Sequence, residues 1–167
     1  MTTTRVLFVC LGNICRSPAA EGVFVHLLEQ QGLSDRFVVD SAGTGGWHVG
    51  RRADERMCAA AARRGIALTS RARQLELGDL HSFDHIVTMD GDNLAAVRAL
   101  ALEAGNPSAQ AQISPMTSYC RIHSSTHEVP DPYYGGPQGF EHVLDLLEDA
   151  CGGLLEALQS LQSEPRM

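Results

Sequence analysis

The segment from Cys10 to Pro18 joins a cysteine, a glycine, an arginine and a serine in an order that suits phosphate chemistry. Gly12 and Asn13 tolerate backbone angles that other residues avoid, so the loop can curl with its N–H groups pointing inward. Such a loop before a helix N-terminus binds an oxyanion, and the planar guanidinium of Arg16 can hold two phosphate oxygens. The same positive field favours thiolate over thiol at Cys10. The segment therefore predicts displacement at phosphorus through a phosphocysteine intermediate.

The spacing between the cysteine and the arginine is not specific by itself, because Cys58 and Arg64 repeat it. An alanine-rich run joins those two residues and favours a helix, whose backbone N–H groups bond to its own carbonyls. We therefore expect Cys58 to lie on a helix face. The prediction for Cys10 depends on the strand before it and on the glycine and proline after it.

Departure of an alkoxide or phenolate from phosphorus needs a general acid, and Asp131 is the best candidate. It lies in a loop bounded by proline and glycine, beside Tyr133 and Tyr134, whose rings fit an aryl phosphate. Aspartates in Asp-Pro turns are also frequent on surfaces, which leaves a purely structural role open. Asp90 and Asp92 follow a predicted strand, and we expect them to cap the next helix rather than to act as acids.

Strands alternate with helices along the chain, which predicts an α/β fold: a doubly wound parallel sheet with helices on both faces. In such sheets ligands bind beyond the carboxyl ends of the strands, where Cys10 lies. Gly152 and Gly153 are expected to weaken or divide the last helix. Strands are expected at 5–10, 37–42, 85–89 and 111–116, and helices at 18–31, 54–64 with Asp54 as N-cap, 90–102 and 140–161.

Length and composition indicate one domain over residues 1–167, with residues 162–167 as a frayed tail. The chain shows no signal peptide pattern and no apolar run of the roughly 18 residues that a membrane span needs, so we expect a cytoplasmic protein. A net charge of −7 without a basic stripe argues against nucleic acid and anionic membranes as partners. The five cysteines are an odd number at scattered positions, which argues against a secreted disulfide framework.

A second group of residues has spacing that resembles a metal site: Cys120, His123 and His127. These three lack a clear fourth ligand and lie in a short polar segment, so we expect no metal there. The other histidines pair with no nucleophile, and we expect them to be ordinary packing or surface residues.

The chain resembles the low-molecular-weight protein tyrosine phosphatases at four motifs that occur in the family's order. These motifs are Val9-Cys10-Leu11-Gly12-Asn13-Ile14-Cys15-Arg16-Ser17-Pro18, Asp40-Ser41-Ala42-Gly43, Thr88-Met89-Asp90 and Asp131-Pro132-Tyr133-Tyr134-Gly135. The resemblance implies a flavodoxin-like sheet of four parallel strands and a reaction without a cofactor. It also implies that Cys10 is the nucleophile, that Arg16 clamps the phosphate and the transition state, and that Asp131 is the acid that later activates water.

The same resemblance implies roles for the residues around these three. The phosphate-binding loop would comprise Leu11, Gly12, Asn13, Ile14, Cys15 and Ser17, with Ser41 supporting its hydrogen bonds. Trp47, Tyr133 and Tyr134 would line the substrate cleft. Cys15 would form a reversible disulfide with Cys10 that shields the nucleophile from over-oxidation. The chain departs from the family at Ser70, where a histidine often braces the phosphate loop, which bears on the rigidity of that loop.

Together these features predict an enzyme that hydrolyses phosphotyrosine in proteins, with a tyrosine kinase as one candidate substrate. We also expect a monomer. An alternative is a thioredoxin-coupled arsenate reductase of the same fold, but that reaction needs a downstream cysteine pair, and the segment from His81 to Asp90 holds no cysteine. A non-catalytic phosphate-binding module or a flavin carrier would have no use for a cysteine in this loop.

Overall fold

Four parallel strands form the centre of the structure, a computed structural model that describes residues 3–106, 110–133 and 135–163. They lie in the spatial order β2-β1-β3-β4, and β1 pairs with both β2 and β3. This order is that of a doubly wound, flavodoxin-like sheet, as the sequence predicts. The strands are β1 (Thr4–Cys10), β2 (Phe37–Gly43), β3 (His85–Thr88) and β4 (Gln112–Pro115).

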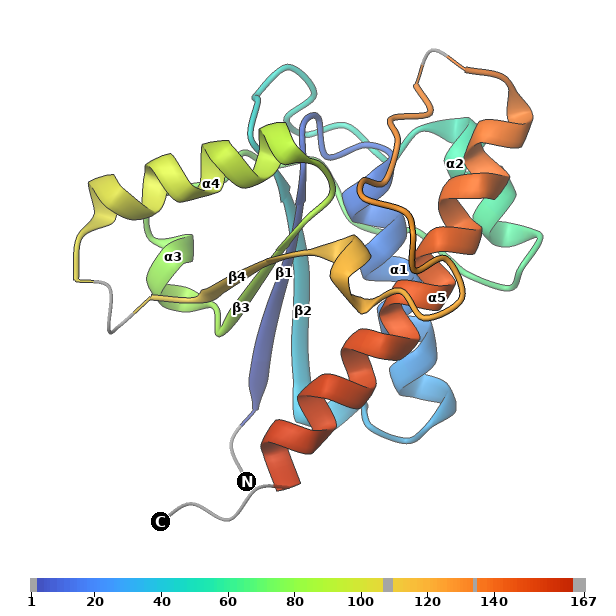
Figure 1. The fold of residues 1–167 in the computed structure, drawn as a ribbon. Coiled ribbons are helices and arrows are strands. Elements are labelled where there is room, and N and C mark those ends of the chain that lie inside the picture. The colour runs from blue at the N-terminus through green and yellow to red at the C-terminus, as the bar shows by residue number, and fades with distance from the viewer. Residues whose placement is uncertain (1–2, 107–109, 134, 164–167) are drawn as a thin grey trace.

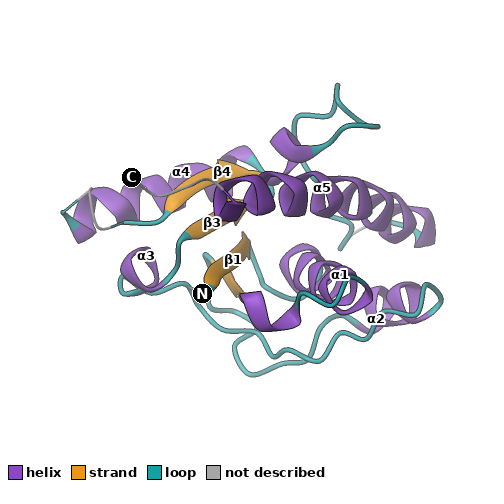
Figure 2. Ribbon diagram, turned by 90° about the horizontal axis from the view of Figure 1, so that it is seen from below, coloured by secondary structure: helices purple, strands orange, loops and turns teal. Residues whose placement is uncertain are grey.

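The helices cover both faces of this sheet, as expected for a doubly wound fold. Figure 1 shows α3 and α4 on one side of the strands and α1, α2 and α5 on the other. From below, in Figure 2, α3 again lies on the opposite side of the strands from α1 and α2. The helices are α1 (Arg16–Gln30), α2 (Glu55–Ala62), α3 (Asp79–Ser82), α4 (Gly91–Ala104) and α5 (Pro137–Ser163), with 3-10 turns at Ser34–Arg36 and Met116–Tyr119.

The strand β1 is apolar throughout because both of its faces are buried. Val6 and Phe8 belong to the hydrophobic cluster that includes α1, α2 and α5. Leu7 and Val9 point to the other face and belong to a second cluster, built with α3 and α4. A strand that is covered on both faces loses the alternation of polar and apolar residues, which explains the continuous apolar run in the sequence. Two packed faces also hold the C-terminal end of β1 in a fixed position.

The last helix differs from its prediction, because α5 runs without a break through Gly152 and Gly153. The reason lies in its packing: a Cβ atom on Gly153 would lie 2.0 Å from the carbonyl oxygen of Tyr119. The glycine thus lets α5 approach the 3-10 turn closely and does not divide the helix. The helix also continues to Ser163, so the first two residues of the predicted tail are helical, and Gln162 Nε2 donates to Thr4 Oγ1 at 2.7 Å.

Other boundaries shift by a few residues, and the short helix α3 was not predicted. Asp54 does cap α2: its carboxylate accepts from the backbone N–H groups of Arg56 and Met57, although the helix ends at Ala62 rather than at Arg64. Asp90 caps α4 in the same way. Residues 164–167 of the predicted tail lie outside the described residues.

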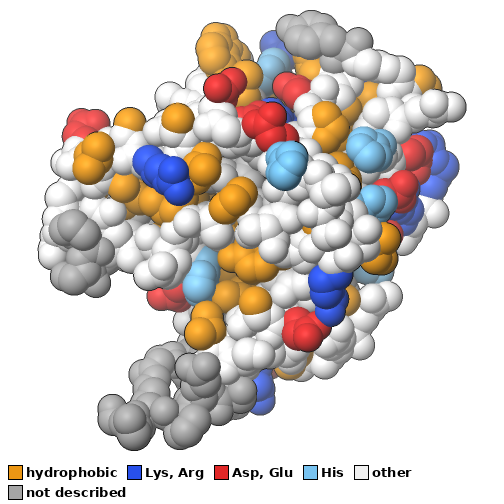
Figure 3. Space-filling view, in the orientation of Figure 1, with side chains coloured by type: hydrophobic (Ala, Val, Ile, Leu, Met, Phe, Trp, Pro, Cys, Tyr) orange, Lys and Arg blue, Asp and Glu red, His pale blue; other side chains and the backbone are white. Residues whose placement is uncertain are grey.

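The described part of the surface has no large basic patch on the face shown in Figure 3, and the described helices are not of a membrane-spanning kind. On the face shown in Figure 3, the arginine side chains lie as separate spots, several of them beside acidic side chains. Within the described ranges of the chain, no helix combines the length and the apolar composition needed to cross a membrane.

Candidate active site

The loop between β1 and α1 curls around a central cavity, as the sequence predicts. Asn13 takes the left-handed backbone conformation, with φ at 57°, and its backbone N–H points at the Cys10 sulfur at 3.3 Å. The start of the next loop supports this turn, since the Thr44 N–H donates to the carbonyl of Cys10 at 2.9 Å. Gly43 is required at the end of β2, because a Cβ atom there would lie 2.7 Å from the carbonyl oxygen of Leu11.

A buried hydrogen-bond network orients the donors that face the Cys10 sulfur. Asn13 Nδ2 donates to Ser17 Oγ at 2.7 Å and to Ser41 Oγ at 3.0 Å. Ser17 Oγ lies 3.0 Å from the Cys10 sulfur and 3.5 Å from the carbonyl oxygen of Ala42. Because a thiolate can only accept, the Ser17 hydroxyl is the donor when Cys10 is ionised. Cys10 thus has one hydroxyl and one backbone N–H directed at its sulfur. Ser41 lies where the family resemblance implies a supporting residue.

The network continues to a carboxyl group that sequence reasoning missed. The Ser41 hydroxyl donates to Glu21 Oε1 at 2.6 Å, and Ser70 also hydrogen-bonds this carboxylate. Burial raises the pKa of Glu21 above its ordinary value, against the effect of these hydroxyl donors. Ser70, the position that departs from the family, therefore helps to hold the loop through its hydrogen bond with Glu21. The Arg73 backbone N–H completes the hydrogen-bond network of Asn13 by donating to Asn13 Oδ1 at 3.0 Å.

Arg16 is buried and held by contacts from several elements. Its Nη1 donates to Asp90 Oδ2 at 2.6 Å and to the carbonyl of Val129 at 3.1 Å, and its Nη2 lies 3.6 Å from Asp131 Oδ2. Burial opposes the charge of Arg16, but the neighbouring Cys10 and Asp90 raise its pKa above the ordinary value. Asp90 therefore orients the arginine as well as capping α4, and the pairing was not predicted.

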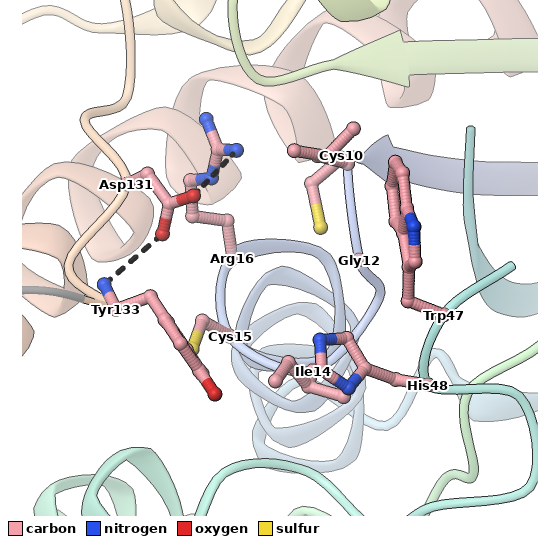
Figure 4. A pocket seen from close by; sticks show the side chains of 10 residues that line it. Cys10, Gly12, Ile14, Cys15, Arg16, Trp47, His48, Asp131 and Tyr133 are labelled. Carbon is pink, nitrogen blue, oxygen red and sulfur yellow. Dashed lines mark hydrogen bonds and ion pairs between the residues drawn. The ribbon is translucent and has the colours of Figure 1, made fainter. Parts of the chain in front are cut away.

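Asp131 lies at the rim of the same cavity, and its side chain is 42% exposed. Its Oδ1 accepts from the Tyr133 backbone N–H at 3.0 Å, which fixes the carboxylate within its own loop. Figure 4 shows the Cys10 sulfur with Asp131 and Arg16 on one side and Trp47 on the other. Although Asp131 lies far from Cys10 in sequence, the fold brings both to one site.

The cavity has a volume of about 400 Å³ and apolar walls above a polar floor. Trp47, 72% exposed, forms one wall, and the rings of His48 and Tyr133 approach each other with centroids 6.1 Å apart. His48 was not predicted as a site residue, and its only signal in the sequence was its place beside Trp47. Tyr134 lies outside the described residues. The lining residues are Cys10, Leu11, Gly12, Ile14, Cys15, Arg16, Trp47, His48, Asp131 and Tyr133.

All five cysteines are free thiols in the structure, and they differ in environment. Cys15 is buried and lines the cavity with Cys10; burial, with Asp54 and Asp131 nearby, raises its pKa far above the ordinary value. Cys58 lies on α2 and donates to the carbonyl of Ala53, which confirms that the second match to the spacing is a helix face. Nowhere in the part of the chain that the structure describes do three or more His, Cys, Asp or Glu side chains gather so that they could hold a metal ion.

The fold and the cavity define a class: a doubly wound α/β protein with a cysteine and an arginine in an oxyanion-binding loop at the end of β1. The family model for low molecular weight phosphotyrosine protein phosphatases matches residues 5–164. The chain belongs to this family.

Relatives and solved structures agree with this assignment. A low molecular weight protein-tyrosine-phosphatase from Streptomyces coelicolor is 44% identical over 158 residues, covering 94% of each chain. A crystal structure of a protein tyrosine phosphatase from Entamoeba histolytica superposes with a TM-score of 0.88 at 41% identity, covering 96% of this chain and 99% of the other. A Drosophila protein described as an arginine phosphatase superposes with a TM-score of 0.85 at 32% identity, covering 92% and 96%.

Proposed function

We propose that the protein hydrolyses phosphotyrosine in proteins through a phosphocysteine intermediate. The Cys10 thiolate attacks phosphorus, an S–P bond forms, and the P–O bond to the tyrosine ring breaks. Asp131 gives its proton to the departing phenolate oxygen. Asp131 then takes a proton from a water molecule that attacks phosphorus, the S–P bond breaks, and phosphate leaves with the Cys10 thiolate restored.

The observation that carries this proposal is the meeting of Cys10 and Arg16, from the loop after β1, with Asp131, from a distant loop, in one cavity. We expect a phosphate seated in the loop to accept hydrogen bonds from backbone N–H groups of the curled loop and from the guanidinium of Arg16. The transferred group carries its negative charge on the non-bridging oxygens, so donors fixed in place before the reaction stabilise the transition state. The Ser17 hydroxyl and the Asn13 N–H stabilise the negative charge on sulfur, both before attack and as the sulfur departs.

The walls of the cavity support an aromatic leaving group. The fold alone does not decide this point, because a Drosophila relative of the same fold is described as an arginine phosphatase. Here Trp47 and Tyr133 form aromatic walls above the loop, and Ile14 adds an apolar side chain at its edge. Such walls favour a flat ring over the flexible, charged arm of an arginine.

The proposed reaction also bears on the substrate, the location and the oligomeric state of the protein. A phosphotyrosine enzyme of this class has a phosphoprotein as its substrate, and a tyrosine kinase that phosphorylates itself is the candidate we favour. The odd number and scattered positions of the five cysteines argue against a secreted disulfide framework, which supports a cytoplasmic location. We keep the monomer as the expected state in solution.

Cys15 supplies a redox function at the same site. Peroxide oxidises the Cys10 thiolate to a sulfenic acid, the Cys15 thiol condenses with it, and water leaves as the disulfide forms. The raised pKa of Cys15 supports this order, because Cys15 stays a thiol while Cys10 takes the oxidant. A dithiol reductant reverses the step.

The alternative of an arsenate reductase has no observation in its favour. Its relay needs a further cysteine that can reach the cavity, and the three remaining cysteines do not line it. Cys120 and Cys151 are both buried: the thiol of Cys120 donates to the carbonyl of Leu146 on α5, and the thiol of Cys151, on α5 itself, donates to the carbonyl of Ala20 on α1.

Hydrolysis of p-nitrophenyl phosphate by matched variants tests the proposal. Cys10→Ser should reduce turnover to background, while Cys58→Ser, a half-buried cysteine on α2, should keep it. Asp131→Ala should lower the rate of phosphocysteine formation, measured in single turnovers, strongly for phosphotyrosine and less for p-nitrophenyl phosphate, whose leaving group needs little protonation. Steady-state turnover of both substrates should fall, because hydrolysis of the common intermediate loses its base. Unchanged hydrolysis in Cys10→Ser would contradict the proposal, and arsenate-dependent oxidation of thioredoxin would revive the reductase.

A further inference from the structure

The loop that carries Asp131 has no secondary structure of its own, so other contacts must hold it over the cavity. Before the acid, the Val129 N–H donates to the carbonyl of Met89 at 2.8 Å, and the Val129 carbonyl accepts from Arg16. At the acid itself, the contact with Arg16 spans 3.6 Å and the hydrogen bond with Tyr133 is local. After the acid, the position of the loop therefore depends on the contacts of Tyr133.

Arg56, on the first turn of α2, contacts both the backbone and the ring of Tyr133, beside the contact of that ring with His48. Its Nη2 donates to the carbonyl oxygen of Tyr133 at 3.0 Å, and its Cζ lies 5.5 Å from the centre of the Tyr133 ring. The same guanidinium lies 4.8 Å from the centre of the Phe140 ring on the first turn of α5. A single planar group thus fixes both the backbone and the ring of Tyr133 and ties them to α5.

Asp54 fixes Arg56 in turn and joins it to the phosphate loop. Its carboxylate accepts from Arg56 Nε at 3.1 Å and from Arg56 Nη2 at 2.9 Å, a two-point contact that sets the plane of the guanidinium. The same carboxylate caps α2, which restrains it further. The Asp54 backbone N–H donates to the carbonyl of Ile14, inside the phosphate loop, at 2.8 Å. Direct contacts therefore run without a gap from Ile14 through Asp54, Arg56 and Tyr133 to Asp131.

We infer that Arg56 is a positioning residue for the general acid: it sets the place of Asp131 relative to the phosphate loop. The inference rests on the proposed role of Asp131. Arg56 does not line the cavity, so its effect reaches the reaction through Tyr133 and Asp131. Placement of a proton donor within hydrogen-bond reach of the leaving oxygen is sensitive to shifts of about 1 Å.

A double-mutant cycle with Asp131 tests this inference on the purified full chain. In single turnovers, Arg56→Gln should lower the rate of phosphocysteine formation from phosphotyrosine about tenfold to a hundredfold, with little change in substrate affinity, because proton delivery to the leaving oxygen is disturbed. The loss should be much smaller for p-nitrophenyl phosphate. In the Asp131→Ala background, Arg56→Gln should cause no further loss. Arg56→Lys should behave like Arg56→Gln, since an ammonium group cannot make the two-point contact and the carbonyl bond together.

Arg63→Gln is the matched control. Arg63 caps the C-terminus of the same helix and pairs with Glu141 on α5, away from the acid loop, so its removal should leave the rate of phosphocysteine formation unchanged. Thermal unfolding of each variant separates a folding defect from a loss of positioning.

Distinct results would overturn distinct claims. An equal loss from Arg56→Gln in the wild-type and Asp131→Ala backgrounds would overturn the positioning role. So would a rise in KM without any loss of rate, if Arg56→Lys brought KM back to the wild-type value, because Arg56 would then merely attract the anionic substrate by its charge. Undiminished turnover in Asp131→Ala on phosphotyrosine would instead overturn the acid assignment, and the role of Arg56 with it.

Discussion

Cys10 has two donors directed at its sulfur, and both depend on Asn13. The Asn13 backbone provides one N–H directly, and its side chain donates to the oxygen of Ser17, whose hydroxyl donates to the sulfur when Cys10 is ionised. Asn13 can do this because it adopts a positive φ, which few residues tolerate. Ser41 and Glu21 then hold the asparagine amide from behind. The chemistry of one thiol is thus prepared by side chains that do not line the cavity.

Ser17→Ala should therefore lower activity without unfolding the protein. A hydrogen bond to a charged group contributes about 1.5–3 kcal/mol, so kcat should fall roughly tenfold to a hundredfold. Ser118→Ala, which removes an exposed hydroxyl bonded to the Pro115 carbonyl, is the control and should keep the wild-type kcat. A Ser17→Ala enzyme that works at full rate would exclude this role.

Among the elements, α5 contacts several of those that carry or flank the site: α1, α2 and the 3-10 turn after β4. It packs along α1 and against the 3-10 turn at Met116–Tyr119, and its first turn carries Phe140, which contacts Arg56. The close approach to the turn depends on Gly153, where no side chain fits beside the Tyr119 carbonyl. Gly152, one residue earlier, meets only the flexible end of the Arg121 side chain, with Nη2 at 3.2 Å.

These two glycines should respond oppositely to alanine. Gly152→Ala gains helix propensity and should stabilise the protein by up to about 1 kcal/mol, since the arginine can move aside. Gly153→Ala forces α5 away from the turn and should destabilise it by roughly 1–3 kcal/mol, an ordinary cost of overpacking. Urea unfolding of both variants measures the difference. Equal stabilities would show that the close contact does not constrain α5.

At the scale of the whole molecule, two carboxyl groups make stability depend on pH in opposite directions. Burial raises the pKa of Glu21 above 4.5, so its ionisation costs folding free energy as pH rises through that raised value. Burial also works against the charge of Asp149, but backbone N–H groups of residues 121–123 donate to it and hold its pKa below 3.8. The stabilisation that ionised Asp149 gives to the fold is present above pH 3.8, the ordinary pKa, and is lost as the pH falls through the lowered pKa of this carboxyl group.

Glu21→Gln should therefore gain stability relative to the wild type as pH rises from about 4 to about 7. Asp149→Asn should be less stable than the wild type at neutral pH, and the difference should shrink in acid. Urea unfolding across this pH range measures both trends. Parallel curves for either variant and the wild type would contradict the corresponding pKa shift.

The sequence predicted the contiguous phosphate loop and, from the composition of its loop and the family resemblance, the distant Asp131, but it missed the side-chain pairings between distant segments. The phosphate loop is contiguous, so Cys10, Gly12 and Arg16 carry their chemistry in a single string, and the βα alternation predicted the sheet. The pairing of Asp90 with Arg16, and the link from Asp54 through Arg56, join segments far apart in the chain. No spacing rule marks such contacts, because they depend on how the helices pack.

Covalent trapping on the Asp131→Ala variant tests the central claim most directly. With p-nitrophenyl phosphate the phosphocysteine should form, and it should persist because the group that activates water is missing. Quenching in denaturant, followed by mass measurement of the digested protein, should show one phosphoryl group on the peptide that contains Cys10. The same treatment of Asp131→Ala with Cys10→Ser should show none. A phosphoryl group on any other residue, or turnover with no phosphoryl group on Cys10, would contradict the account.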